Sequence, residues 1–227
     1  MKERPILFSA PMVRAILDGT KTQTRCTIKP QPNVTAESLR CPDHDHLSLS
    51  ARVNEAWRAG FIPVRCPYGT TGDQMWVREH YTVAEVEGYG TGHGFAVFDD
   101  EWVQRDGATE PAPRELRPIT GQKWGSHAGF HLPRLASRIT LEVESVRAER
   151  VQDISEADAK AEGIAEPMPA HGKWCDPALG RGGHWSYRLP FSQLWDSINA
   201  ARGHSWETNS WVWVISFRVL DAKRAAA

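Results

Sequence analysis

The segment from Ser137 to Gln152 limits the possible folds of this chain more than any other. Its apolar residues Ile139, Leu141, Val143 and Val146 mostly alternate with polar ones. This alternation is typical of a strand with one buried face, because successive side chains of a strand point to opposite sides. The segment therefore predicts a long strand in a β-rich core.

Capping signals delimit the helices that accompany this strand. Ser9 can cap a helix with Pro11 in its first turn, and Gly19 stands where a left-handed residue ends such a helix. Ser155 and Gly163 delimit a second helix in the same way. Further helices are expected near residues 53–59 and 190–200, and further strands at 4–8, 22–28, 74–83 and 211–219, with a short hairpin around 95–103. This order of elements predicts an α+β fold, a small mixed or antiparallel β-barrel with flanking helices.

Three stretches lack a clear hydrophobic period and are rich in Gly, Pro or charged residues. They lie at roughly 30–71, 85–123 and 164–189. We interpret them as long loop insertions in a single domain that comprises residues 1–227.

Composition excludes several classes of protein. The net charge is −1, so binding to nucleic acid would need a local basic patch rather than a basic surface overall. No run approaches the ~18 apolar residues of a membrane span, and the N-terminus lacks the apolar stretch of a signal peptide. Four cysteines in such a chain indicate reduced thiols. We therefore expect a cytoplasmic protein without a membrane partner.

The polar run from Gly19 to Arg25 contains the first candidate for chemistry. Lys21 and Thr24 lie three residues apart, which puts them on opposite faces of an extended segment unless the chain turns at Thr22. An amine that has lost its proton could take the hydrogen of the Thr24 hydroxyl. Alternatively, Lys21 only complements the dipole of the preceding helix, and its position alone favours this reading.

Glu162 is the second candidate. It falls in the last turn of the helix that begins after Ser155, where an acid is disfavoured by about 0.3–1 kcal/mol. An acid in this position could be a charge partner for Lys21 or a proton donor. It could equally be an exposed surface residue, and the position alone favours that reading.

Residues 8–25 (FSAPMVRAILDGTKTQTR) closely resemble the opening of the ASCH domain family, in which a G-x-K-x-x-x-R-like signature follows the first helix. The chain is most similar to the phage- and prophage-encoded branch, because residues from both ends of the chain match that branch. The further matching blocks are 72–79 (GDQMWVRE), 131–140 (HLPRLASRIT), 152–159 (QDISEADA) and 211–214 (WVWV). The resemblance implies a PUA-like fold, which is a small β-barrel.

The resemblance also implies an activity. Small ASCH proteins include bacterial amidohydrolases that remove the acetyl group of N(4)-acetylcytidine with a Lys, a Thr and a Glu. Carried over to this chain, those positions are Lys21 as general base, Thr24 as acyl acceptor and Glu162, which orients Lys21 or handles the leaving-group proton. No cofactor is implied.

A set of polar and aromatic side chains is expected to bind the ligand. Guanidinium groups grip phosphate or base edges, and a tryptophan can stack on a base. The alternatives are ion pairing with acids such as Glu79 for the arginines and a place in the core for Trp76. The expected ligand-binding residues are Arg25, Trp76, Arg78, Glu79, Arg134, Ser137 and Arg138.

A zinc site is a weaker hypothesis. Cys41, His44, His46 and Cys66 lie in one predicted insertion, and a structural zinc could hold that segment together. The spacing matches no standard finger, and free thiols with solvated histidines are the more ordinary interpretation.

Three functions remain open at this point. The first is hydrolysis of an acetylated cytidine or a related modified nucleoside. The second is a binding module that holds RNA or a modified nucleotide without turnover, since fold alone does not decide function. The third is a ribonuclease, which is disfavoured because no compact set of carboxylates suggests a catalytic metal site.

Overall fold

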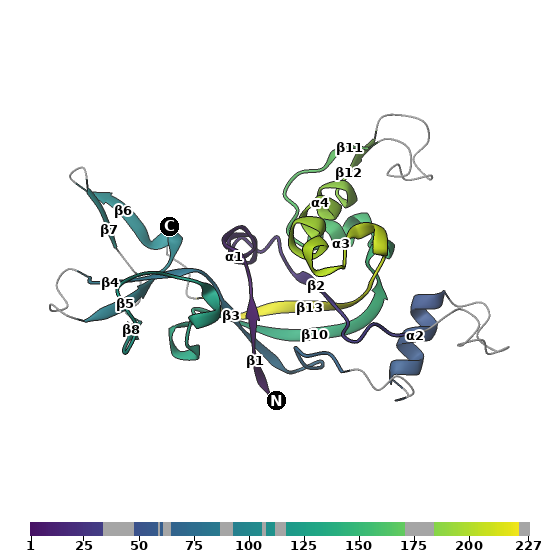
Figure 1. Ribbon diagram of the computed structural model, residues 1–227, viewed down its shortest axis with the longest axis horizontal. Helices are drawn as coiled ribbons and strands as arrows, with labels where there is room; N and C mark the ends of the chain where they lie inside the picture. The colour runs from purple at the N-terminus through teal and green to yellow at the C-terminus, as the bar shows by residue number, and fades with distance from the viewer. Residues whose placement is uncertain are drawn as a thin grey trace. The chain divides into compact units, whose positions relative to one another are not determined.

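The computed structural model describes residues 1–33, 48–58, 60, 65–86, 93–105, 108–111, 117–170 and 184–222 (Figure 1). Helices and strands are interspersed along the chain, so the predicted α+β class is confirmed. The α-helices are α1 (Ala10–Leu17), α2 (Leu49–Arg58), α3 (Glu156–Ala161) and α4 (Arg188–Asn199). The strands are β1 (Glu3–Leu7), β2 (Gln23–Thr27), β3 (Gln74–Arg78), β4 (Tyr81–Ala84), β5 (Gly94–Val97), β6 (Trp102–Arg105), β7 (Ala108–Pro111), β8 (Pro118–Ile119), β9 (Gly125–His127), β10 (Ile139–Arg150), β11 (Met168–Ala170), β12 (His184–Ser186) and β13 (Trp211–Ala222).

The chain divides into two compact units. Unit 1 contains residues 1–18, 72–143 and 218–227, and unit 2 contains residues 19–71 and 144–217. The largest sheet has the order β1-β3-β10-β13-β2, and its strands β10 and β13 each contribute residues to both units. None of the described sheets closes into a barrel. The single domain with three insertions stays a prediction.

The long strand predicted at 137–152 is present as β10. Its buried positions follow the odd numbers Ile139, Leu141 and Val143 and then shift to the even numbers Val146 and Ala148. The shift falls where the chain passes from unit 1 to unit 2. Val146 therefore breaks the alternation of apolar residues because the buried face of the strand changes there.

The capping signals correspond to the observed helix ends. Ser9 precedes α1, Pro11 lies in its first turn, and Gly19 adopts a left-handed conformation with φ of 72°. The Ser155 side chain accepts a hydrogen bond from the Asp158 backbone N–H at the start of α3, and Gly163 follows that helix with φ of 88°. The Ser155 side chain thus caps α3, whereas Ser9 stands at the N-cap of α1 without a side-chain capping hydrogen bond, and a left-handed glycine follows each helix.

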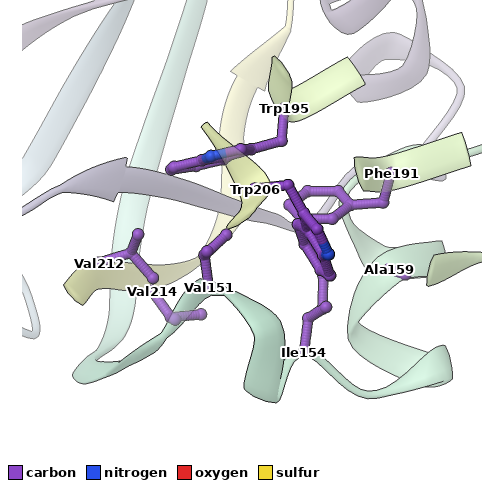
Figure 2. Close-up of a cluster of buried hydrophobic side chains, with 8 residues drawn as sticks. All are labelled: Val151, Ile154, Ala159, Phe191, Trp195, Trp206, Val212 and Val214. Atoms are coloured by element: carbon purple, nitrogen blue, oxygen red, sulfur yellow. The ribbon is translucent and has the colours of Figure 1, made fainter. Parts of the chain in front are cut away.

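Unit 2 has a sheet with helices on both faces. On one face, a buried apolar cluster joins α3 and α4 to β13, and Figure 2 shows its side chains converging. The cluster comprises Val151, Ile154, Ala159, Phe191, Trp195, Trp206, Val212 and Val214. On the other face, Trp57 of α2 packs on Trp213 with ring centroids 4.6 Å apart, since Trp213 alternates with Val212 and Val214.

Unit 1 departs from the predicted strand at 74–83. The chain forms β3, which pairs with β1 and β10, and then β4, which pairs with β5 and β9. The break falls at Glu79, whose buried carboxylate pairs with Arg138. An ionic side chain that turns inward for a partner thus interrupts a run that reads as one strand.

The predicted hairpin around 95–103 is also different. β5 pairs with β4 and β8, whereas β6 pairs with β7. Four consecutive residues around β5 are at most 7% exposed: Phe95, Ala96, Val97 and Phe98. This stretch therefore supplies part of the core of unit 1.

No helix of the described ranges is long and apolar enough to cross a membrane.

Candidate functional site

Lys21 lies at the junction between α1 and β2, in an extended segment that bridges to Glu162. Its side chain is buried, and Nζ donates three hydrogen bonds. The acceptors are the Gln23 carbonyl at 2.9 Å, the Glu162 carbonyl at 2.8 Å and Glu162 Oε2 at 2.8 Å. An ammonium carries three hydrogens, so these contacts use its whole donor capacity.

Glu162 caps the C-terminal end of α3 and is only 5% exposed. Its carboxylate accepts from Lys21 through Oε2 and from Arg25 Nη1 through Oε1, the latter at 2.9 Å. These two cations outweigh the unfavourable dipole at the helix end. The sequence suggested that an acid has little structural reason to stand there, and its burial against two cations is that reason.

Arg25 is the centre of the same group. Its guanidinium donates to Glu149 through Nε and Nη2, to Gln23 Oε1 at 2.7 Å and to Asp158 Oδ2 at 3.3 Å. Burial acts to lower the pKa of Arg25, but the carboxylates of Glu162 and Glu149 outweigh it and raise the pKa. Arg25 is therefore held as a cation by its neighbours.

Asp158 and Arg147 form the more accessible edge of this group, with 25% and 32% of their side chains exposed. Arg147 Nη2 donates to Asp158 Oδ2 at 3.0 Å, and Arg147 Nε donates to Glu149 Oε2 at 3.1 Å. Burial acts to raise the pKa of Asp158, but Arg25 and Arg147 outweigh it and lower the pKa.

We call this group the ionic cluster, and it balances three cations against three carboxylates. A buried network of this kind is tolerated only when each charge is paired and hydrogen-bonded. All of its members belong to unit 2. The ionic cluster consists of Lys21, Arg25, Arg147, Glu149, Asp158 and Glu162.

Thr24 lies on the other face of β2. Gln23 and Arg25 point to the ionic cluster, so strand alternation directs Thr24 to the face of its β13 partner Ile215. Thr24 is 8% exposed, and its hydroxyl has no hydrogen bond to another described residue. The structure therefore brings Lys21 and Glu162 together and directs Thr24 away from them.

The remaining predicted ligand-binding residues lie in unit 1, whereas Arg25 lies in unit 2. Arg138 donates to both oxygens of Glu79 at 2.9 Å and also pairs with Asp100. Burial acts to lower the pKa of Arg138, but hydrogen bonds to Glu79 and Asp100 raise it. Burial raises the pKa of Glu79 against the opposing attraction of Arg138. Both side chains are thus committed to an internal ion pair.

The other four predicted contacts have structural partners as well. Arg134 forms an ion pair with Glu3, with Nη2 2.9 Å from Oε1. Ser137 Oγ donates to the Val77 carbonyl at 2.8 Å. Trp76 is 7% exposed, with the Arg78 guanidinium 4.7 Å from its ring centroid. Burial of Trp76 agrees with a place in the core.

The zinc hypothesis falls mostly outside the described residues. Cys41, His44 and His46 are not among them, and Cys66 is buried. Within the described ranges, no group of three metal-ligating side chains is present.

Burial raises the pKa of Cys26 well above its ordinary value and raises that of Tyr68 to about 12.

Sequence reasoning missed Arg147, Glu149 and Asp158 as members of the ionic cluster. Glu149 left no distinct signal, because the same strand also carries the charged residues Glu142, Glu144, Arg147 and Arg150. Asp158 left a signal, because it precedes Glu162 by four residues and so shares a face of α3 with it. Its carboxylate pairs with Arg25 and Arg147.

Comparison with protein-family models, with curated proteins and with solved structures found no match to this chain.

Proposed function

We propose that this chain is an amidohydrolase that removes an acyl group from an acetylated cytidine or a related modified nucleoside, and that its fold is PUA-like. The observation that carries the proposal is the contact between Lys21 Nζ and Glu162 Oε2 at 2.8 Å. These residues are 141 positions apart, and they are two of the three residue types that the ASCH resemblance requires. A direct bond between them supports the role of Glu162 as the group that orients Lys21.

The described arrangement limits how the two residues can act. Lys21 Nζ uses all of its donors, so the proposed role as a base requires it to lose a proton and release one acceptor first. In its protonated form, the same group can instead donate a proton to the departing cytidine amine. Thr24 can serve as acyl acceptor only if β2 rearranges, because Lys21 and Thr24 face opposite sides.

A second function is favoured by a specific observation. Lys21 and Glu162 are at most 5% exposed and saturate each other, which suits a rigid scaffold better than an exposed reacting group. This supports a module that binds a modified nucleotide or RNA without turnover. No contact of the described residues favours the ribonuclease.

The test is incubation of the chain with N(4)-acetylcytidine, with release of acetate and cytidine as the readout. Three proteins are compared: the native chain, Thr24→Val and Thr22→Val. Thr24→Val removes a hydroxyl that lies outside the ionic cluster, and Thr22→Val is a matched change at an exposed threonine on the same strand face. We expect turnover in the native chain and in Thr22→Val.

Each outcome identifies one function. Turnover that is lost only in Thr24→Val supports the hydrolase with Thr24 as acyl acceptor. Turnover that persists in Thr24→Val supports a hydrolase with another nucleophile. Saturable binding without acetate release supports the binding module, and absence of both binding and turnover refutes the proposal.

A further inference from the structure

Three polar side chains of unit 1 form a hydrogen-bonded chain at the protein surface. His80 Nε2 lies 2.7 Å from Ser126 Oγ, and His80 Nδ1 lies 3.2 Å from Asp99 Oδ1. With its hydrogen on Nδ1, His80 donates to Asp99 while Nε2 accepts the hydrogen of the Ser126 hydroxyl. The order of contacts is hydroxyl, imidazole, carboxylate, which is the arrangement that activates a serine nucleophile. We call these three residues the surface triad.

The elements of unit 1 hold these residues in place. His80 lies between β3 and β4, where the chain turns from one sheet to the other. Ser126 is the middle residue of β9 and lies opposite Thr82 of β4, two residues beyond His80. Asp99 begins a 3-10 helix (Asp99–Glu101) that directly follows β5 and Phe98. The positions are thus fixed by pairing in one sheet rather than by a single loop.

The carboxylates that follow Asp99 have other partners. Asp100 pairs with Arg138, and Glu101 pairs with Arg117 at 2.9 Å. Asp99 is the acid of this short helix that faces the imidazole. A carboxylate so placed fixes the tautomer of His80 and stabilises the imidazolium that forms when the ring takes a proton.

Accessibility separates the surface triad from other serine contacts in the chain. The His80 and Asp99 side chains are 44% and 49% exposed, and Ser126 is exposed as well. The Ser210 hydroxyl also contacts an imidazole, that of His204 at 3.0 Å, but Ser210 is buried. A nucleophile needs access to substrate, and Ser126 has it.

The surroundings of the surface triad indicate the class of substrate. Gly129 packs so tightly that a Cβ there would lie 2.8 Å from the Glu79 carbonyl carbon and 2.9 Å from Leu7 Cδ1. Gly129 thus lies against Leu7 and against Glu79, the residue before His80, and Phe130 follows Gly129 in the sequence. Phe130 and Leu7 are each 57% exposed, so the triad borders apolar surface that can hold a hydrocarbon group.

We propose that the surface triad is a second catalytic site, an esterase for carboxylic esters with an apolar acyl group. Ser126 Oγ attacks the ester carbonyl carbon while His80 Nε2 takes the hydroxyl proton. The tetrahedral intermediate expels the alcohol, which receives that proton, and leaves an acyl group on Ser126. Water then attacks the acyl carbon, His80 takes one of its protons and returns it to Ser126 Oγ, and the carboxylic acid leaves.

The edge position of β9 suits this reaction. β9 is the last strand in the order β8-β5-β4-β9, so one of its edges has no neighbouring strand among the described residues. Alternate backbone N–H groups on such an edge point away from the sheet. These are the donors nearest in sequence to Ser126 that can face the oxyanion of the intermediate.

The first test is covalent labelling with diisopropyl fluorophosphate, which phosphorylates activated serines and releases fluoride. We expect one adduct per chain, located on Ser126 by peptide mass mapping. His80→Gln should lose the adduct although it keeps Ser126. Ser50→Ala is the matched control, because Ser50 is a partly exposed serine bonded to a carboxylate, that of Asp153 at 2.8 Å, rather than to an imidazole.

The second test is hydrolysis of p-nitrophenyl butyrate. We expect Ser126→Ala and His80→Gln to lower the rate about 10²–10⁴-fold, and Asp99→Asn to lower it with the adduct site unchanged. An adduct elsewhere than Ser126, no adduct, or equal hydrolysis by the native chain and Ser126→Ala would overturn the proposal. Circular dichroism of each variant shows that a loss is not due to unfolding. Labelling uses no nucleoside, so its failure leaves the proposal for Lys21 and Glu162 untouched.

Discussion

The ionic cluster of unit 2 and the surface triad of unit 1 place similar functional groups in opposite surroundings. In the ionic cluster, Lys21, Arg25 and Glu162 are at most 8% exposed, and each is bonded to an opposite charge. In the surface triad, two of three side chains are close to half exposed, and the hydroxyl contacts His80. Burial and pairing thus give the first group a structural role beside its proposed chemistry, whereas the second group remains accessible to solvent.

Of the substitutions considered, Arg25→Met in the ionic cluster should have the largest effect on stability. The substitution leaves Glu149 and Glu162 with fewer partners in a buried place, so we expect a loss of about 3–5 kcal/mol in the free energy of unfolding. Urea unfolding followed by tryptophan fluorescence measures it. Arg147→Ala is the matched control at the exposed edge and should lose at most about 1 kcal/mol. Equal losses in both variants would contradict a buried core of the cluster.

Ser155→Ala tests how far the ionic cluster depends on the helix that carries Asp158 and Glu162. It removes the hydrogen bond from the Asp158 N–H to the Ser155 hydroxyl, which is 3.0 Å long. We expect a loss of about 1 kcal/mol in urea unfolding. Ser205 is partly exposed and precedes a 3-10 helix without forming a side-chain cap, so Ser205→Ala should change stability less.

The dependence of stability on acid pH tests the contribution of Asp158 to the ionic cluster. Its pKa is lowered in the folded chain by Arg25 and Arg147 against the effect of burial. A lowered folded pKa adds stability that is present above the unfolded value, about 3.9, and is lost as pH falls through the folded value. Asp158→Asn should therefore show a shallower loss of stability below about pH 4 than the native chain. If both proteins lost the same free energy of unfolding between about pH 4 and lower pH in urea unfolding, the protonation of Asp158 would not be linked to folding.

Ser126→Ala should have the smallest effect on stability. Its hydroxyl is exposed, so we expect a change within about 0.5 kcal/mol in urea unfolding. The same variant is expected to abolish labelling, so stability and reactivity separate at this residue. A loss as large as that of Arg25→Met would mean that the surface triad supports the fold as the ionic cluster does.

Local signals in the sequence predicted much of the secondary structure. Gly19, Ser155 and Gly163 lie where helices begin or end, because capping depends on residues a few positions apart. The prediction of one strand over residues 74–83 was wrong, because the chain breaks at Glu79, which turns inward to pair with Arg138, 59 residues away. No local pattern reveals such a partner.

The residues of the candidate sites likewise divide into those that the sequence could predict and those that depend on tertiary contacts. Lys21 and Glu162 were paired from the family resemblance, and the structure brings them into contact. Glu149 and Asp158 could not be assigned, because their contact with Arg25 depends on how β2, β10 and α3 pack. His80, Asp99 and Ser126 each look ordinary in sequence and come together through the pairing of β4 with β9 and with β5.

By itself, the sequence determined the helix ends, the alternating faces of β10 and β2, and the presence of a Lys, a Thr and a Glu that fit one chemistry. Only the tertiary structure decided that the segment stays extended, without the turn at Thr22 that would bring Lys21 and Thr24 together, because β2 pairs with β13 and Lys21 bridges to Glu162. It also decided which charges are buried and which groups remain exposed. Those properties arise from contacts between distant segments, and an ionisable group's chemistry depends on the partners and the water that such contacts leave it.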